Sequence, residues 1–135
     1  MTYRFVVEGQ PVAKARPRVV DGHAYTAEKT RVAETVMGWA AKQAGVSIGS
    51  APCAVTMRCY FAIPKSWPKR WKEDAIGGIL RPTGKPDADN LLKLLDGLNH
   101  VAWDDDGQVV EAHVEKWYSH RPHTEVEIRV IGEKA

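Results

Sequence analysis

The chain has 135 residues, of which 44% are hydrophobic and 27% charged, and its formal net charge at pH 7 is +2. This length suits one compact domain, and the apolar content is too high for a disordered polypeptide. No apolar run approaches the ~20 residues of a membrane helix, and no signal segment opens the chain, so we expect a cytoplasmic protein. The two cysteines, Cys53 and Cys59, are expected to be buried reduced thiols on one side of a strand.

The first half of the chain predicts a strand, a helix and a second strand. Residues 2–9 form the first strand, and the segment after it carries turn signals such as Asp21-Gly22. Thr26 is a suitable N-cap for a helix that Gly45 ends, because apolar residues between them keep a helical period. Residues 53–63 alternate between apolar and polar side chains and predict the second strand.

The second half contains a long connection, a helix and two strands. The connection spans residues 64–86, with a helical turn expected near 71–77, and connections of this length are usually functional or disordered. The helix spans about 90–99, and strands 108–118 and 124–131 are expected to be antiparallel. The helix buries a stripe of leucines, Leu91, Leu94, Leu95 and Leu98. The order β-α-β-loop-α-β-β predicts an α+β fold with a mixed sheet in one small domain, residues 1–135.

Carboxylates stand on both sides of the leucine helix. Asp87 and Asp89 precede it, and Asp89 occupies the expected N-cap position. Lys93 follows Asp89 by four residues, so the two share a helix face that is not the leucine stripe. A helix cap and a solvated surface would explain these residues on their own. Their place away from the core also allows a site.

A run of three aspartates, Asp104, Asp105 and Asp106, follows the helix and precedes Gly107. Such a run can be a solvated turn, but adjacent carboxylates repel one another and a divalent cation would relieve the repulsion. Hard cations such as Mg²⁺ bind oxygen ligands, and an open site can hold a phosphate oxygen and activate a water. The spacing does not fit a calcium EF-hand loop, and no glycine-rich phosphate loop is present. The five histidines are scattered and are expected at the surface rather than as ligands.

Cationic residues gather elsewhere, in an early group and in the long connection. These candidate DNA-binding residues are Lys14, Arg16, Arg18, Lys65, Lys69, Arg70, Lys72 and Lys85. Contacts from such side chains to phosphates would give an affinity that falls steeply with salt. Trp67 and Trp71 lie among them and could either stack on unpaired bases or cover the leucine helix, and the sequence favours neither.

The segment "KPDADNLLKLLDGLN…DDDGQVV" resembles the signature of RusA-type Holliday junction resolvases, the crossover-junction endodeoxyribonucleases of bacteria and prophages. Residues 87–93 fill its Asp-x-Asp-Asn-Leu-x-Lys part, 96–98 its Asp-x-Leu part, and 105–109 its Asp-Asp-x-Gln-Val part. The segments "EGQPVAKARPR", "AYTAEKT", "IPKSWPKRWKE" and "VEKWY" are also similar, so nearly the whole chain is covered. One departure is Asp104, which precedes the usual pair of aspartates.

This resemblance implies a nuclease that cuts four-way DNA junctions with Mg²⁺ or Mn²⁺ in DNA recombination and repair. It places Asp87, Asp89 and Asp106 at the metal-binding catalytic positions, Asp105 beside them, and Lys93 at the position of the catalytic lysine. Two other functions remain open: a nuclease acting on flaps, forks or single strands, and a phage DNA-binding protein of the same fold that does not cleave.

The resemblance also implies a homodimer. One chain carries one aspartate cluster, whereas resolution of a junction needs two matching cuts, and closed twofold dimers are the commonest assembly. Leu92 widens the apolar face of the helix beyond the leucine stripe, and residues 64–86 are long enough to reach a second chain. Both features are candidates for the dimer interface.

Overall fold

The computed structural model describes residues 1–13, 18–21, 23–25 and 28–133, without the side chains of 18–20 and 23–25. Two predicted DNA-binding residues, Lys14 and Arg16, and the predicted cap Thr26 lie outside the described residues. Among the residues that are described, no helix has the length and apolar content needed to span a bilayer.

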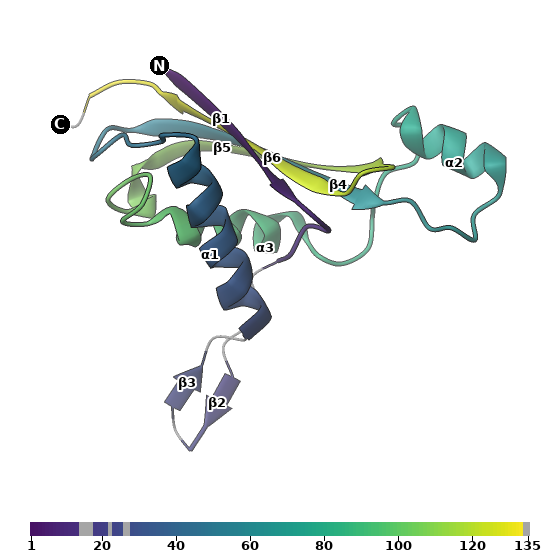
Figure 1. The fold of residues 1–135 in the computed structure, drawn as a ribbon, viewed down its shortest axis with the longest axis horizontal. Helices are drawn as coiled ribbons and strands as arrows, with labels where there is room; N and C mark the ends of the chain where they lie inside the picture. Colours follow the sequence, from purple (N-terminus) through teal and green to yellow (C-terminus); the bar gives the residue numbers. More distant parts are fainter. Residues whose placement is uncertain (14–17, 22, 26–27, 134–135) are drawn as a thin grey trace.

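A four-stranded sheet in the order β1-β6-β4-β5 forms the body of the molecule (Figure 1). The strands are β1 (Thr2–Glu8), β4 (Cys53–Ala62), β5 (Val109–Ser119) and β6 (His123–Val130). β6 pairs antiparallel with both β1 and β4, whereas β4 and β5 are parallel, so the sheet is mixed as predicted. β5 and β6 run in opposite directions as expected, but β4 lies between them and they are not neighbours.

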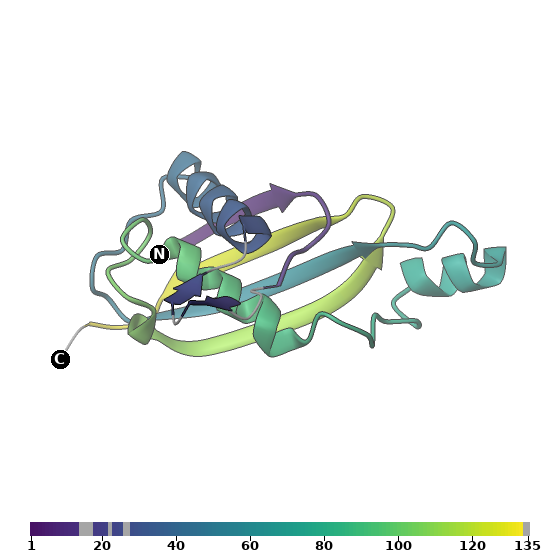
Figure 2. The ribbon, with the colours of Figure 1, turned by 90° about the horizontal axis from the view of Figure 1, so that it is seen from below.

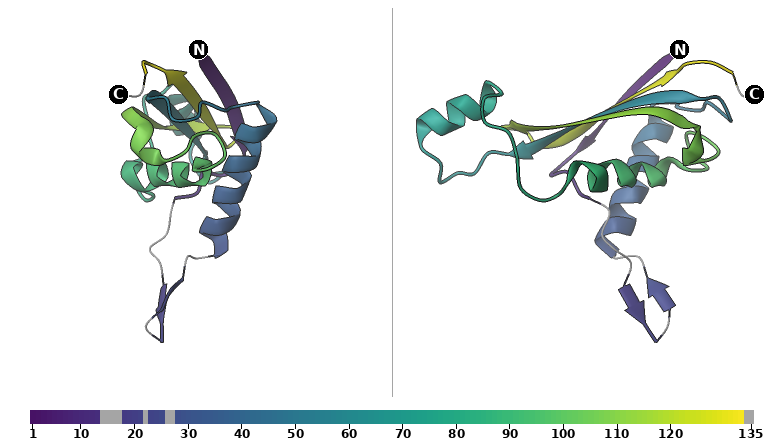
Figure 3. Two further views of the ribbon diagram at one scale, coloured as in Figure 1. Left: turned by 90° about the vertical axis from the view of Figure 1, so that its left-hand side faces the viewer. Right: turned by 180° about the vertical axis from the view of Figure 1, so that it is seen from behind.

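Helices cover one face of this sheet and leave the other face open (Figures 2 and 3). They are α1 (Glu28–Gln43), α3 (Ala88–Leu92) and the 3₁₀ helix η1 (Lys93–Leu98). Every second residue of β4 from Cys53 to Phe61 is buried, which matches the period of a strand with one covered face. The predicted leucine stripe, Leu91, Leu94, Leu95 and Leu98, is buried in the same core.

Both cysteines lie in β4 on the covered face, buried and unbridged, as predicted. Burial raises the pKa of the Cys59 thiol to about 12 and also raises the pKa of the Cys53 thiol. Neither group is therefore a reactive thiolate near neutral pH.

The predicted helix of residues 90–99 differs from the structure in its start and its type. α3 begins at Ala88, so Asp87 and not Asp89 occupies the N-cap position, with extended backbone and no side-chain capping bond. The chain then tightens into a 3₁₀ helix, in which residues three apart, such as Leu95 and Leu98, lie above one another on the core side. Leu92 is half-buried and also packs against this core, so part of the wider apolar face is covered within this chain.

One histidine departs from the expected surface placement. His123 is only 7% exposed, and its ring stacks on Tyr60 with the centroids 4.4 Å apart. Among the described side chains, His100, His113 and His120 are exposed, as predicted.

Two segments project from the body (Figure 1). The first is a hairpin of β2 (Arg18–Val20) and β3 (His23–Tyr25), where the sequence predicted only loop and turn because three-residue strands are too short to show alternation. The second, called the arm below, is residues 64–86, and its helix α2 (Lys69–Ile76) confirms the expected helical turn. α3 lies in the angle between the two projections.

α1 and η1 cross with their backbones in close contact. A Cβ added at Gly38 would lie 2.8 Å from the carbonyl oxygen of Gly97, and one at Gly97 would lie 2.9 Å from the Cα of Glu34. Side chains larger than hydrogen therefore do not fit at the crossing, and this contact sets the distance between α1 and the leucine stripe.

We expect Gly97→Ala to lower the free energy of unfolding by about 1–3 kcal/mol, because the added methyl group must push two backbones apart. Gly84→Ala is the matched control, since a Cβ there would meet no atom within 4 Å. Urea unfolding of the two variants measures the difference. Equal stability of Gly97→Ala and the unchanged protein would contradict the close crossing.

Candidate active site

A row of charged side chains runs along the outer face of α3 and η1. Lys93 follows Asp89 by four residues across an α-helical turn, and Asp96 follows Lys93 by three residues across a 3₁₀ turn, so the three share one face. The Lys93 Nζ lies 3.8 Å from the Asp89 Oδ2 and 3.5 Å from the Asn90 Oδ1. The leucine stripe holds the opposite face in the core, so this row faces away from it.

Asp106 extends the row from a second element, the short 3₁₀ helix η2 (Asp106–Gln108). The pKa of the Asp106 carboxyl is raised, first by a hydrogen bond with the Asp96 side chain, then by slight burial and by the negative charges of Asp105 and Asp96. These influences favour the protonated form of the Asp106 carboxyl. The sequence prediction did not assign Asp96 to the site, although its spacing from Lys93 was visible.

The acidic turn is held by its own hydrogen bonds. Asp105 caps η2, because its Oδ2 accepts a hydrogen bond from the Gly107 N–H at 3.1 Å. The Gln108 Oε1 accepts hydrogen bonds from the N–H groups of Asp104 and Asp105, each at 2.9 Å. The Asp105 carboxylate is therefore engaged in capping, whereas Asp106 faces Asp96.

Gln108 also ties this turn to the loop before β4. Its Nε2 donates to the carbonyl oxygens of Gly49 and Ala51, at 2.7 and 2.9 Å. On the other side of the turn the indole of Trp103 is buried and donates to the Asn99 Oδ1 at 2.7 Å. These anchors fix the position of the aspartate run against the body.

The predicted metal ligands form two groups. Asp87 and Asp89 stand at the amino end of α3, and Asp106 stands at the far end of the row beside Asp96. Within the described part of the chain, no three Asp, Glu, His or Cys side chains lie close enough together to hold a metal ion. Lys93 lies between the two groups along the helix.

The chain that leads to Asp87 is clamped along β5. The Lys116 Nζ donates to the Gly84 carbonyl oxygen at 2.6 Å, and the Arg81 Nε donates to the Lys116 carbonyl oxygen at 2.6 Å. The Arg81 guanidinium also lies 3.3 Å from the centre of the Trp117 ring. This clamp could not be predicted from the sequence, because residues distant in the chain form it.

Predicted DNA-binding residues lie on both projections. Arg18 begins the hairpin strand β2. The others belong to the arm, where Lys72 is half-buried and the rest are exposed: Lys65, Lys69, Arg70 and Lys85. The ion pair of Lys69 with Glu73 is long, at 3.9 Å, and exposed, so it neutralises little of this charge. α3, with Asp87 and Asp89 at its amino end, lies between the two projections (Figure 1).

Comparison with known proteins gives two matches. The family model described as endodeoxyribonuclease RusA matches residues 8–129 of this chain. The uncharacterized protein YqaN of Bacillus subtilis (strain 168) is 39% identical over 137 residues, which cover 96% of each chain. Both matches include the arm, the charged row and the acidic turn. The chain therefore belongs to the RusA endodeoxyribonuclease family.

Proposed function

We propose that this protein is a metal-dependent endonuclease that hydrolyses phosphodiester bonds of branched DNA, with the four-way junction as its substrate. The observation that carries the proposal is the charged row: carboxylates at both ends of an exposed helix face with a lysine between them. Family membership supports nuclease activity and a DNA substrate. The basic arm that leads into the row supplies cations for a polyanion.

The chemistry of the acidic side chains, though not their spacing in this structure, suits a hard divalent cation such as Mg²⁺ or Mn²⁺. Asp87, Asp89 and Asp106, with Asp105 beside them, offer carboxylate oxygens, the ligand type that these cations prefer. The hydrogen bond with Asp96 contributes most to the raised pKa of Asp106, and the charges of Asp105 and Asp96 add to it; a cation would offset the repulsion between these charges. When bound, the cation would supply charge to the scissile phosphate and lower the pKa of a water molecule.

Lys93 supplies positive charge within the row. Its ammonium group is exposed, and its contacts with Asp89 and Asn90 are long, at 3.8 and 3.5 Å. It can therefore turn towards a phosphate oxygen at small cost and stabilise the negative charge that develops during hydrolysis. The arm cations hold the DNA backbone beside it, and they contribute affinity rather than chemistry.

Asp106→Asn should abolish cleavage while DNA binding survives or tightens, because the change removes a ligand and also a negative charge. A panel of four-way junctions, flaps, forks, single strands and duplexes, assayed for cleavage and by gel shift, measures both effects. If the unchanged protein cleaves flaps or single strands in preference to junctions, those DNAs and not the four-way junction are its substrate. Binding without cleavage of any DNA would leave a non-cleaving DNA-binding protein, and full activity of Asp106→Asn would remove Asp106 from the site.

Lys93→Ala should lower kcat by roughly 100-fold or more, the usual cost of losing one charge-stabilising donor. Stability should change little, because exposed ion pairs four residues apart contribute only about 0.3–0.5 kcal/mol. Lys69→Ala is the matched control, since Lys69 forms a similar exposed pair with Glu73. That control should weaken DNA binding and leave kcat unchanged. If folded Lys93→Ala cleaves DNA at the normal single-turnover rate, Lys93 has no role in the chemistry and only pairs with Asp89.

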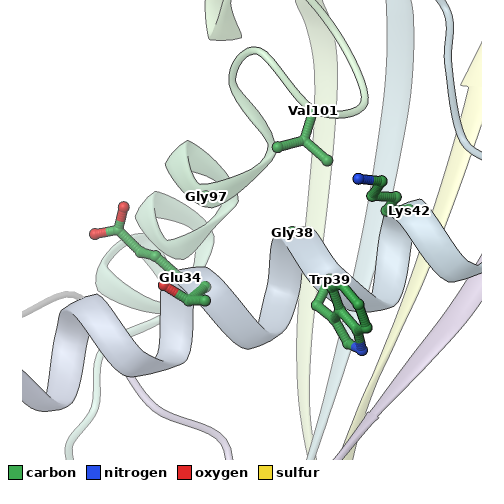
Figure 4. Close-up of a pocket in the computed structure, with 7 residues that line it drawn as sticks. Glu34, Gly38, Trp39, Lys42, Gly97 and Val101 are labelled. Atoms are coloured by element: carbon green, nitrogen blue, oxygen red, sulfur yellow. The ribbon is translucent and has the colours of Figure 1, made fainter.

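A homodimer would provide the second cut, and α1 offers the surface for it. Val32, Val36 and Trp39 lie on one side of α1 and are 55%, 43% and 61% exposed. Beside them runs a shallow groove over the Gly38–Gly97 crossing, with Trp39 at its edge (Figure 4). Glu34 and Lys42 stand at opposite ends of this groove, so an antiparallel α1 from a second chain would bring unlike charges together.

Sedimentation equilibrium at micromolar protein should therefore show the mass of two chains, and Trp39→Asp should shift it towards one. Trp71→Leu removes an equally large exposed ring from the arm and should leave the dimer intact. A protein that stays monomeric, both free and on a junction, would exclude the dimer and favour a nuclease that makes single cuts.

A further inference from the structure

Three aromatic rings lead from the edge of the core out along the arm. Tyr118 pairs with Phe61 across β5 and β4, so it lies on the helix-covered side of the sheet. Trp67 packs edge-on against Tyr118, with centroids 5.2 Å apart and planes at 71°. Trp71 packs edge-on against Trp67, at 5.7 Å and 84°, and is 51% exposed. Trp67 is thus used in packing on β5, whereas Trp71 ends the series in solvent.

The arm that carries Trp71 is held by contacts of its own. Ala75, four residues after Trp71 on α2, is only 1% exposed. Gly78 lies so close to Trp117 that an added Cβ would be 2.9 Å from the indole ring, and Arg81 covers the same indole. The segment around Trp71 is therefore folded and packed, and the Trp71 ring is exposed on its surface.

Charge around Trp71 indicates what would cover it. Residues 64–86 contain six cationic side chains and only two acidic ones, Glu73 and Asp74, and Arg70 and Lys72 flank Trp71 directly. An exposed ring among cations is the arrangement with which proteins hold single-stranded nucleic acid, because the cations bind phosphates while the ring stacks on a base. An apolar protein partner would need a surface with less charge.

The position of Trp71 fits the branch of a DNA substrate. The arm runs directly into the amino end of α3, where Asp87 and Asp89 begin the charged row (Figures 1 and 2). Duplex DNA keeps its bases stacked inside, whereas a branch point can offer unstacked bases next to the phosphates of the exchanging strands. α2 lies on the outer part of the arm, and the arm leads from it to the charged row (Figures 1 and 2). A ring on this arm meets unstacked bases only when the DNA that it binds is branched.

We propose that Trp71 is a base-stacking site that gives this protein its preference for branched over duplex DNA. The inference rests on the proposed function, since it takes DNA as the substrate. To that function it adds a side chain, Trp71, that distinguishes branched DNA from duplex DNA. Trp67 and Tyr118 act as positioning residues, which hold the Trp71 ring at the end of the series.

The test compares Trp71→Leu, which keeps apolar bulk without an aromatic face, with Trp71→Phe, which keeps a ring. Each variant is placed in the Asp106→Asn background, so that the DNA remains uncut. The probes are a four-way junction with 2-aminopurine at the branch and a duplex of the same length. Ile79→Ala is the matched control, because Ile79 is a 74% exposed apolar side chain on the same arm.

Trp71→Leu should bind the junction roughly 5- to 150-fold more weakly, the usual effect of losing one stacked base. Duplex binding should stay unchanged, and the 2-aminopurine quenching caused by the protein should be lost. Trp71→Phe should retain most of both signals, and Ile79→Ala all of them. Because no charge changes, the slope of log affinity against log salt should be the same in every variant.

Three results would overturn the proposal: unchanged junction binding by Trp71→Leu, equal losses on junction and duplex, or equal losses in Trp71→Leu and Ile79→Ala. The last would indicate a general apolar contact. Other results distinguish a failure of the proposed nuclease function from a failure of the stacking site. If the unchanged protein cuts no DNA while junction binding still depends on Trp71, the stacking site stands; if cleavage is normal and Trp71→Leu changes nothing, only the stacking site is wrong.

Discussion

Burial of the leucine stripe is the constraint on which the rest of the site depends. Four leucines of α3 and η1 pack under the sheet, so the remaining face of that helix must point away from the core. Asp89, Lys93 and Asp96 occupy that face, and the change from α to 3₁₀ geometry at Lys93 keeps them in line. The close crossing of α1 at Gly97 holds the helix against the sheet. A hydrophobic requirement thus orients the polar site.

Several features followed from the sequence because they depend on local periodicity. Alternation in residues 53–63 located β4 and its buried cysteines, and the leucine spacing located the buried side of α3 and η1. The i, i+4 relation predicted that Asp89 and Lys93 share a helix face, and in the structure their charged groups lie 3.8 Å apart. The motif in residues 87–109 indicated the family that the comparison established.

Other features depend on contacts between distant parts of the chain, and such contacts cannot be predicted from local periodicity. The pairing of Asp106 with Asp96 needs the turn at 99–103 to fold back onto η1, and the buried indole of Trp103 fixes that turn. The burial of His123 against Tyr60 depends on which strands are neighbours. The sequence left open whether Trp67 and Trp71 stack on bases or cover the leucine helix; in the structure Trp67 packs on Tyr118 of β5 and Trp71 is exposed. The sequence alone could not place that strand beside the arm.

The hydrogen bonds of the Gln108 side chain restrict where residues can be inserted into or deleted from this chain. Its side-chain amide ties the acidic turn to the carbonyls of Gly49 and Ala51, so the distance from the end of α1 to the start of β4 is set by the site. An insertion between residues 44 and 52 would move those carbonyls and displace the aspartates. The arm returns to β5 at Arg81 and Gly84 before α3 begins, so residues added or removed near α2 would leave the charged row in place. The length of the outer arm can therefore change while the charged row keeps its place on the sheet.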